Sequence, residues 1–343
     1  MQGFVELKDV SDRQVPVRGR RYLAGSDSQH VPLAISMANE KLLVLRPSST
    51  LGMAEDAAAC CRPVVDERLD AAGALLFRGL PLGSRDDFNR FMAALGYTPH
   101  SYAGGIAVRA REAGYALLAS QEDARITMAP HNEMAYLPAA PRKVFFFCEQ
   151  AAAQGGEVPI NDIRETVRHI PDAILQAFAD RGIRYHRHLP RESTATQVGW
   201  QETYGVTDAA ELETRLQSQG LEYRWTPEQG LQFSQRQPAF RPDPGGGPPL
   251  WFNQVTELHS SYWRHHPLFP SDGCEADYPA TTTYGDGDPI DPELITFLRA
   301  ALWRTSRAVQ MAPGDVLVLD NTHIQHGRFA YEGQRRHLVS ITA

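Results

Sequence analysis

The segment that decides the fold is GDVLVLDNTHIQHGRFAYEGQRRHLVSITA, residues 314–343, at the end of the chain. Its apolar runs and the turn near Glu332-Gly333 predict a strand, a loop, a short strand, a turn and a final strand. A second segment, HNEMAY, residues 131–136, also reads as a short strand and lies between two prolines. Strand-like segments gather around these two histidine-containing stretches, and helix-like segments flank them. The sequence therefore predicts an α+β fold, with a β core covered by helices.

Other parts of the chain carry clear local signals. Residues 74–80 and 143–150 are short apolar runs that predict buried strands. Ser84 is a good helix N-cap, and apolar residues at helical spacing follow it. Residues 209–220 and 291–305 are helical by period and composition.

Composition and charge exclude several classes of protein. The chain has 343 residues, of which 42% are hydrophobic, so it can bury a large core. Its net charge is −7, which disfavours binding to nucleic acid or to an anionic membrane surface. No apolar run is long enough to span a bilayer, and the four cysteines form no CxxC pair. We expect a soluble cytoplasmic protein with neither a nucleic-acid nor a membrane partner.

The HNEMAY segment suggests a metal site. On a strand, His131 and Glu133 project to one face, and Asn132 projects to the other. A third ligand must then come from another strand, and His326 is the best candidate; His323, three residues earlier in the preceding loop, is the alternative. Two histidines and one carboxylate leave three coordination positions free, which suits non-haem Fe(II) handling oxygen. A structural zinc site would prefer four protein ligands.

A set of motifs gives this pattern its specificity. HNEMAY, GGEVPIND, WFNQ, GDVLVLDNTHIQHGR and GQRRHLVSI resemble, in this order, the taurine dioxygenase (TauD/TfdA) family of Fe(II)/2-oxoglutarate-dependent oxygenases. The middle of the chain is similar to the SyrP-like branch of amino-acid hydroxylases. The resemblance covers roughly residues 60–343. It implies a double-stranded β-helix, or jelly roll, with flanking helices. It also implies that Fe(II) bound by His131, Glu133 and His326 uses 2-oxoglutarate and O2.

The resemblance also implies a domain plan. We expect residues 1–343 to form one oxygenase domain. Within it, residues 1–60 would be an N-terminal extension, and residues 150–250 would hold a lid and insert region.

The co-substrate site is expected near the C-terminus. In the family, an arginine shortly after the second histidine pairs with the distal carboxylate of 2-oxoglutarate. By strand alternation Arg335 and Arg336 face opposite ways, so only one of them faces inward. The motif match places Arg336 inside and Arg335 at the surface. Val158 stands where family members often carry a threonine that bonds to the same carboxylate, so that one hydrogen bond is missing here.

Substrate contacts are predicted less directly. The pocket-lining candidates are Asn132, Tyr136, Trp251 and Asn253. Gln121 and Arg125 lie just before the metal motif and are further candidates for contact with a substrate carboxylate.

The function implied is hydroxylation of an unactivated C–H bond. Related halogenases lack the carboxylate ligand, and this chain keeps Glu133. Desaturation, epoxidation or cyclisation would use the same residues. The expected substrate is a free or carrier-tethered amino acid, or a similar small metabolite, in natural-product biosynthesis; a homo-oligomer is possible. The rival interpretations are a redox-inert metalloenzyme, such as a zinc hydrolase or isomerase on the same barrel, and a non-catalytic jelly roll.

Overall fold

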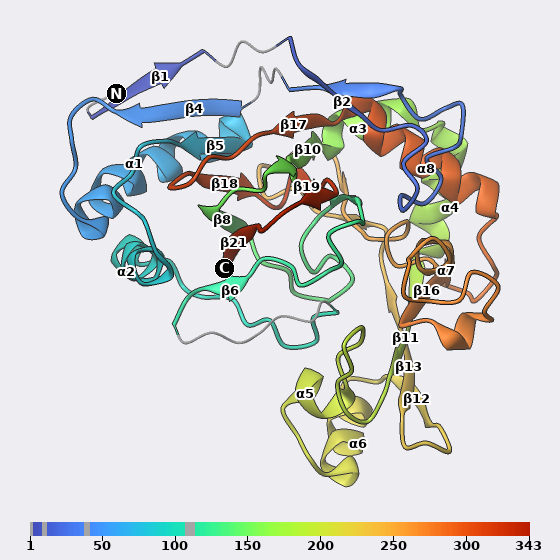
Figure 1. The fold of residues 1–343 in the computed structure, drawn as a ribbon. Coiled ribbons are helices and arrows are strands. Elements are labelled where there is room, and N and C mark those ends of the chain that lie inside the picture. The colour runs from blue at the N-terminus through green and yellow to red at the C-terminus, as the bar shows by residue number, and fades with distance from the viewer. Residues whose placement is uncertain (1–2, 9–11, 38–41, 107–113) are drawn as a thin grey trace.

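The computed structural model describes residues 3–8, 12–37, 42–106 and 114–343 (Figure 1). Two sheets form the centre of the molecule. The larger has the strand order β1 (Phe4–Leu7), β4 (Leu42–Pro47), β5 (Ala74–Phe77), β18 (Val316–Asp320), β8 (Lys143–Gln150), β21 (Arg336–Thr342) and β6 (Leu117–Leu118). The smaller has the order β17 (Arg307–Val309), β10 (Val158–Asp162), β19 (Ile324–Arg328) and β7 (Met128–His131).

The two sheets share one apolar core. Leu76, Phe146 and Val339 from the larger sheet cluster with Ile160 and Ile324 from the smaller one, and all five are buried. Within both sheets neighbouring strands are antiparallel, apart from the parallel pair β4 and β5. The three strands predicted at the C-terminus are present as β18, β19 and β21, and a further two-residue strand that was not predicted, β20 (Tyr331–Glu332), lies between the last two.

The other face of the larger sheet is covered by two helices, α1 (Ala54–Ala72) and α2 (Arg85–Leu95), which lie side by side in Figure 1. A separate buried cluster joins them to the sheet and includes Phe88, which stacks on Phe147 of β8 with ring centroids 5.2 Å apart. Ser84 caps α2, as predicted, because its side chain accepts a hydrogen bond from the Asp87 amide.

A third sheet and the remaining helices lie beyond the smaller sheet. The third sheet has the order β12 (Glu222–Trp225), β13 (Leu231–Gln237), β11 (Ile183–Leu189) and β16 (Ala280–Tyr284). The helices of this part are α3 (Ile163–Thr166), η1 (Val167–His169), α4 (Asp172–Arg181), α5 (Trp200–Tyr204), α6 (Ala209–Ser218), α7 (Ser260–Arg264), η2 (Glu275–Asp277) and α8 (Pro292–Thr305). Two-stranded pairs complete the fold: β2 (Gln14–Pro16) with β3 (Ala34–Ser36), β9 (Gln154–Gly155) with β20, and β14 (Phe240–Arg241) with β15 (Leu250–Trp251).

The ends of β11, β12 and β13, together with α5 and α6, project from the body as a lobe (Figure 1). The lobe has a small apolar core of its own, which includes Trp200, Leu212 and Leu216. The lobe falls within residues 150–250, the region predicted to hold a lid and insert.

The boundaries of the expected subdivisions differ from the structure. Strands β1 and β4 pair with each other at the edge of the larger sheet, so residues 1–60 contribute to the core and are not merely an extension. Strand β10 lies between β17 and β19, so the region 150–250 begins inside the smaller sheet. The projecting part starts only at β11.

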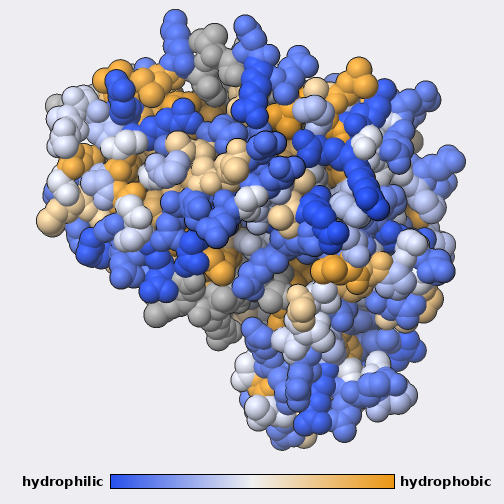
Figure 2. Space-filling model, in the orientation of Figure 1, coloured by the Kyte–Doolittle hydropathy of each residue, from blue (hydrophilic) through white to orange (hydrophobic). Residues whose placement is uncertain are grey.

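The described part of the chain contains no helix that is both long and apolar enough to cross a membrane. The face seen in Figure 2 is largely hydrophilic, with apolar side chains scattered among the polar ones.

Candidate metal centre and active-site cavity

Three side chains far apart in the sequence converge in the smaller sheet. His131 is the last residue of β7, and it pairs directly with His326 of β19. Donor atoms of His131, Glu133 and His326 all lie within 4.8 Å of one another, and His326 Nε2 is 3.4 Å from Glu133 Oε2. All three side chains are buried or nearly so. This trio is the metal site that the sequence predicts.

The local geometry at Glu133 differs from the prediction. Strand β7 ends at His131, so Glu133 lies in the turn that follows and is not part of a strand. The turn includes Met134, whose φ of 56° is left-handed. A side chain holds this turn in place: Asn321 Oδ1 accepts a hydrogen bond from the Glu133 amide at 2.7 Å, and Asn321 Nδ2 donates to the Glu133 carbonyl at 3.1 Å. The buried Asn321 side chain therefore takes the place of a strand partner.

The donors fit a ferrous ion. His131 Nδ1 lies 2.9 Å from the Ala129 carbonyl and donates to it, which leaves Nε2 as the lone-pair donor. Burial lowers the pKa of His131, and the neighbouring His326 lowers it further, so the ring stays neutral as a metal ligand must. Two imidazoles and one carboxylate form the donor set typical of non-haem iron oxygenases.

His323, the alternative ligand, is engaged elsewhere. Its Nδ1 lies 2.6 Å from Asp320 Oδ2, and its Nε2 lies 3.4 Å from Asp243 Oδ1. The hydrogen bond to Asp320 raises the pKa of His323. This histidine links the loop before β19 to the segment that carries Asp243.

The orientation expected for the two adjacent arginines is wrong. His337, Val339 and Ile341 are the residues of β21 on the site-facing side, because the latter two belong to the core between the sheets. Arg335 shares their parity and is largely buried, whereas Arg336 lies on the opposite face, where it pairs with Glu149 and leaves 40% of its side chain exposed. Strand alternation correctly separated the two residues, but the motif match chose the wrong face.

Arg335 has the surroundings of an anion site. Its Nη2 lies 2.9 Å from His337 Nδ1, its buried Nε has no hydrogen-bond partner, and no ion pair joins it to a carboxylate of the described residues. Burial lowers its pKa to about 10, and the nearby Arg328 contributes. A Cβ built on Gly156 would lie 3.1 Å from Arg335 Cδ, so the guanidinium stem packs on the turn that leads into Val158. A buried cation of this kind suits a carboxylate that arrives with a ligand.

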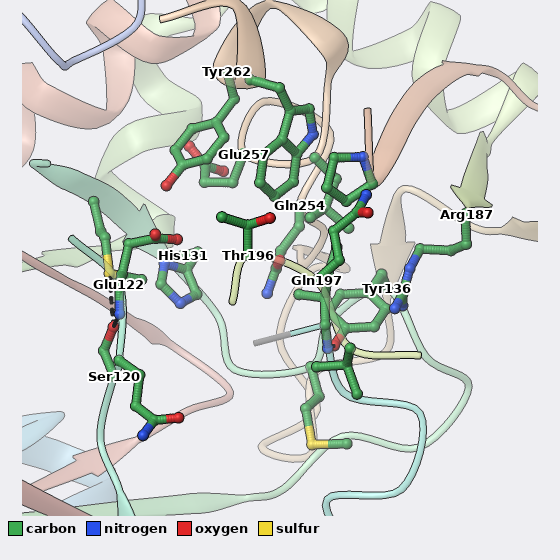
Figure 3. A pocket seen from close by; sticks show the side chains of 18 of the residues that line it. Ser120, Glu122, His131, Tyr136, Arg187, Thr196, Gln197, Gln254, Glu257 and Tyr262 are labelled. Carbon is green, nitrogen blue, oxygen red and sulfur yellow. Dashed lines mark hydrogen bonds between the residues drawn. The ribbon is translucent and has the colours of Figure 1, made fainter. Parts of the chain in front are cut away.

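A cavity opens on the metal site (Figure 3). Its empty volume, including the mouth, is about 1070 Å³, and His131 and Glu133 form part of its wall. Tyr136, predicted to line the pocket, and Gln121, predicted to contact a substrate carboxylate, both lie in the cavity wall. The polar side chains of the wall also include Ser120, Glu122, Arg187, Thr196, Gln197, Gln254, Glu257 and Tyr262.

Comparison with known proteins agrees with this geometry. The family model described as taurine catabolism dioxygenase TauD, TfdA family matches residues 54–342. The chain belongs to the TauD/TfdA family. As a member, it is a 2-oxoglutarate-dependent oxygenase that uses Fe(II) and O2, and the His131, Glu133 and His326 cluster has the donors that such an enzyme needs.

Two relatives align with most of this TauD/TfdA chain. The dapdiamide synthesis protein DdaC of Enterobacter agglomerans is 30% identical over 280 residues, which are 81% of this chain and 84% of the relative. A clavaminate synthase-like protein of Arabidopsis thaliana is 27% identical over 322 residues, 92% of this chain and 94% of the relative. Among solved structures, PvcB of Pseudomonas aeruginosa superposes with a TM-score of 0.48 at 15% identity, covering 97% of this chain and 92% of that one.

Four of the residues expected to contact the substrate do not lie in the wall of the TauD/TfdA cavity: Asn132, Trp251, Asn253 and Arg125. Asn132 points away from the metal and donates to the Asn321 carbonyl. Trp251 packs between Phe178 and Phe240 in a core cluster. Both the others have structural partners, because Asn253 bonds to the Ala239 carbonyl and the exposed Arg125 pairs with Asp123.

The sequence reasoning missed two buried charges in the cavity wall, Arg187 and Glu257. A signal for Arg187 exists in IRYHRHL, residues 183–189. Ile183, Tyr185 and Leu189 occupy the buried face of a strand by alternation, and Arg187 falls on that same face. A charge on the apolar side of a strand requires a partner or a function. Glu257 has no comparable periodic signal.

Proposed function

We propose that the protein hydroxylates an unactivated C–H bond of an amino-acid-like small molecule. The observation that carries the proposal is that two residues of the metal trio, His131 and Glu133, line a cavity whose wall also bears hydrogen-bonding and charged side chains. We also propose that the two central sheets form a double-stranded β-helix, that the whole chain works as one oxygenase domain, and that the lobe beyond β11 acts as its lid.

In this proposal His131, Glu133 and His326 hold the iron, which with 2-oxoglutarate supplies the oxidising chemistry that an unactivated C–H bond requires. Arg335, rather than Arg336, pairs with the distal carboxylate of 2-oxoglutarate. A guanidinium suits this task because its planar fork binds a carboxylate through two hydrogen bonds. Val158 and Phe146, both buried, provide apolar walls between the sheets. These walls exclude water from the bound co-substrate.

Two further features support hydroxylation of a biosynthetic substrate. Glu133 is kept as the third ligand, so no protein ligand position is vacated for a halide. The relative DdaC is named for a role in dapdiamide synthesis, which supports a role in the biosynthesis of a natural product. Desaturation, epoxidation and ring closure would produce different masses, so product analysis distinguishes them.

The test begins with the purified protein under anaerobic conditions. Adding Fe(II) and 2-oxoglutarate should produce the weak visible absorption band of the iron chelate. After O2 is admitted, succinate should form, and the organic product should gain the mass of one oxygen atom. No band with Fe(II), or no succinate with any compound, would contradict the proposal.

A further inference from the structure

Two buried side chains of opposite charge line the cavity, and neither the iron nor the co-substrate uses them. Arg187 on β11 is 3% exposed, and Glu257, between β15 and α7, is 9% exposed. Figure 3 shows them on different walls, with Arg187 beside Tyr136 and Glu257 beside Tyr262. Burying a charge costs free energy unless it is paired. The contacts of each side chain show whether its charge is paired within the protein.

Arg187 is held by weak contacts only. Its Nη1 donates to the Gly104 carbonyl at 3.3 Å, and its guanidinium carbon lies 5.5 Å from the centroid of the Tyr136 ring. Its Nε is buried without a hydrogen-bond partner, and no carboxylate of the described residues forms an ion pair with it. The guanidinium therefore has N–H donors for which the described part of the protein provides no acceptor. An anionic group of a bound molecule would complete this site.

One of the two carboxylate oxygens of Glu257 has a hydrogen-bond partner. Its Oε2 accepts from Thr256 Oγ1 at 2.7 Å, and its buried Oε1 has no partner. The nearby Arg299 directs its donors elsewhere, to Ser261 Oγ at 2.9 Å and to the Thr256 carbonyl at 2.5 Å. One carboxylate oxygen therefore lacks a donor, and burial raises the pKa of Glu257. A cationic donor bound in the cavity would satisfy that oxygen and favour the charged form.

We propose that the cavity binds a free amino acid, with its carboxylate at Arg187 and its ammonium group at Glu257. The inference rests on the proposed function, because it names the substrate class of the same site. It separates two cases that the family leaves open. An amino acid tethered to a carrier through a thioester has no carboxylate, so it would leave the buried guanidinium of Arg187 without an anion. A free substrate provides both charges.

The first test uses the wild-type enzyme with Fe(II), 2-oxoglutarate and O2. The panel contains free α-, β- and ω-amino acids and dipeptides, and succinate release is measured for each. For the best compound we then compare its carboxamide, its N-acetyl derivative and its pantetheine thioester. Loss of either charge should lower kcat/KM about 100-fold or more, since the loss leaves a buried charge unpaired.

The second test uses variants with matched controls. Arg187→Gln should lower kcat/KM for the free amino acid about 100-fold but have little effect on that for its carboxamide, so that the preference for the acid disappears. Arg184→Gln, on the opposite face of β11 and paired with Glu222, should leave the preference intact. Glu257→Gln should likewise remove the preference for the free amine over its N-acetyl form, whereas Glu228→Gln, at an exposed position, should not.

The outcomes separate the two proposals. A purely structural role for Arg187 would lower activity equally for the acid and the amide, and this would overturn the inference. The inference also fails if the thioester is preferred, or if no panel member releases succinate although the iron chelate band is present. Absence of that band would instead overturn the proposed function. If a glutamine variant does not fold, the inference can still be tested with Arg187→Lys and with the series of substrate analogues on the wild-type enzyme.

Discussion

The metal centre and the rest of the cavity wall are built in different ways. His131 and His326 are positioned by strand pairing inside the smaller sheet, where His326 also pairs with Ile160. The rest of the cavity wall comes largely from β11, from the loop before α5 and from the segment between β15 and α7. We infer that the metal centre determines the reaction and that the rest of the cavity wall determines which substrate binds. Substitutions in the two regions should then fail in different ways.

The largest effect is expected at the metal ligands. Replacing His326 or Glu133 by alanine removes one of three protein donors, so the loss should exceed the 10- to 100-fold typical for losing a supporting partner and reach roughly 1000-fold or more. All substrates should be affected equally, and the iron chelate band should disappear. Measuring the band and succinate release side by side tests both statements. A variant that lost turnover with one substrate only would break the proposed division between the regions.

The next effect separates the two adjacent arginines. Arg335→Gln should raise the KM for 2-oxoglutarate about 100-fold, because a buried carboxylate loses its charged partner. Arg336→Gln removes a partly exposed pair with Glu149 and should change this KM by less than about threefold. Titrating 2-oxoglutarate against the initial rate of succinate formation distinguishes them. The reverse ranking would restore the assignment made from the motif.

Some features of the site could be predicted from the sequence, and the orientation of these two arginines could not. Motif order and donor chemistry were enough to identify His131, Glu133 and His326, because the metal restricts the types of ligand and the strands bring two histidines together. The succession of strands at the C-terminus followed from apolar periodicity. The inward face of β21 did not, because alternation separates Arg335 from Arg336 without showing which of them faces the core. That choice depends on tertiary packing, which places Val339 and Ile341 between the sheets.

The walls of the cavity were harder to predict for the same reason. Trp251 and Asn253 belong to a recognisable motif, yet they pack against Phe178 and bond to the Ala239 carbonyl, away from the cavity. Arg187 and Glu257 belong to no motif and lie 70 residues apart (257 − 187). Tertiary packing alone brings them to one cavity.

A smaller effect is expected from the residue that holds the Glu133 turn. Asn321→Ala removes the two hydrogen bonds to the Glu133 backbone and one to the Pro141 carbonyl. The carboxylate would then be less well placed, and Fe(II) affinity should fall about 10- to 100-fold. Titrating Fe(II) anaerobically against the chelate band measures this. Thr322→Ala, on the adjacent, partly exposed residue, is the control and should leave the affinity unchanged.

The smallest effect concerns His323, which lies three residues from His326 but outside the metal trio. Its bond to Asp320 raises its pKa in the folded protein, so its contribution to stability is fully present below its unfolded pKa of about 6.5 and is lost as pH rises through the raised value. For a partly screened pair we expect about 0.5 kcal/mol. The measurement is the difference in unfolding free energy between wild type and His323→Gln across this range, which cancels the titration of the other histidines. If the difference stays constant or grows as pH rises, the protonated His323 does not hold the Asp320 loop, and the metal centre relies on strand pairing and Asn321 alone.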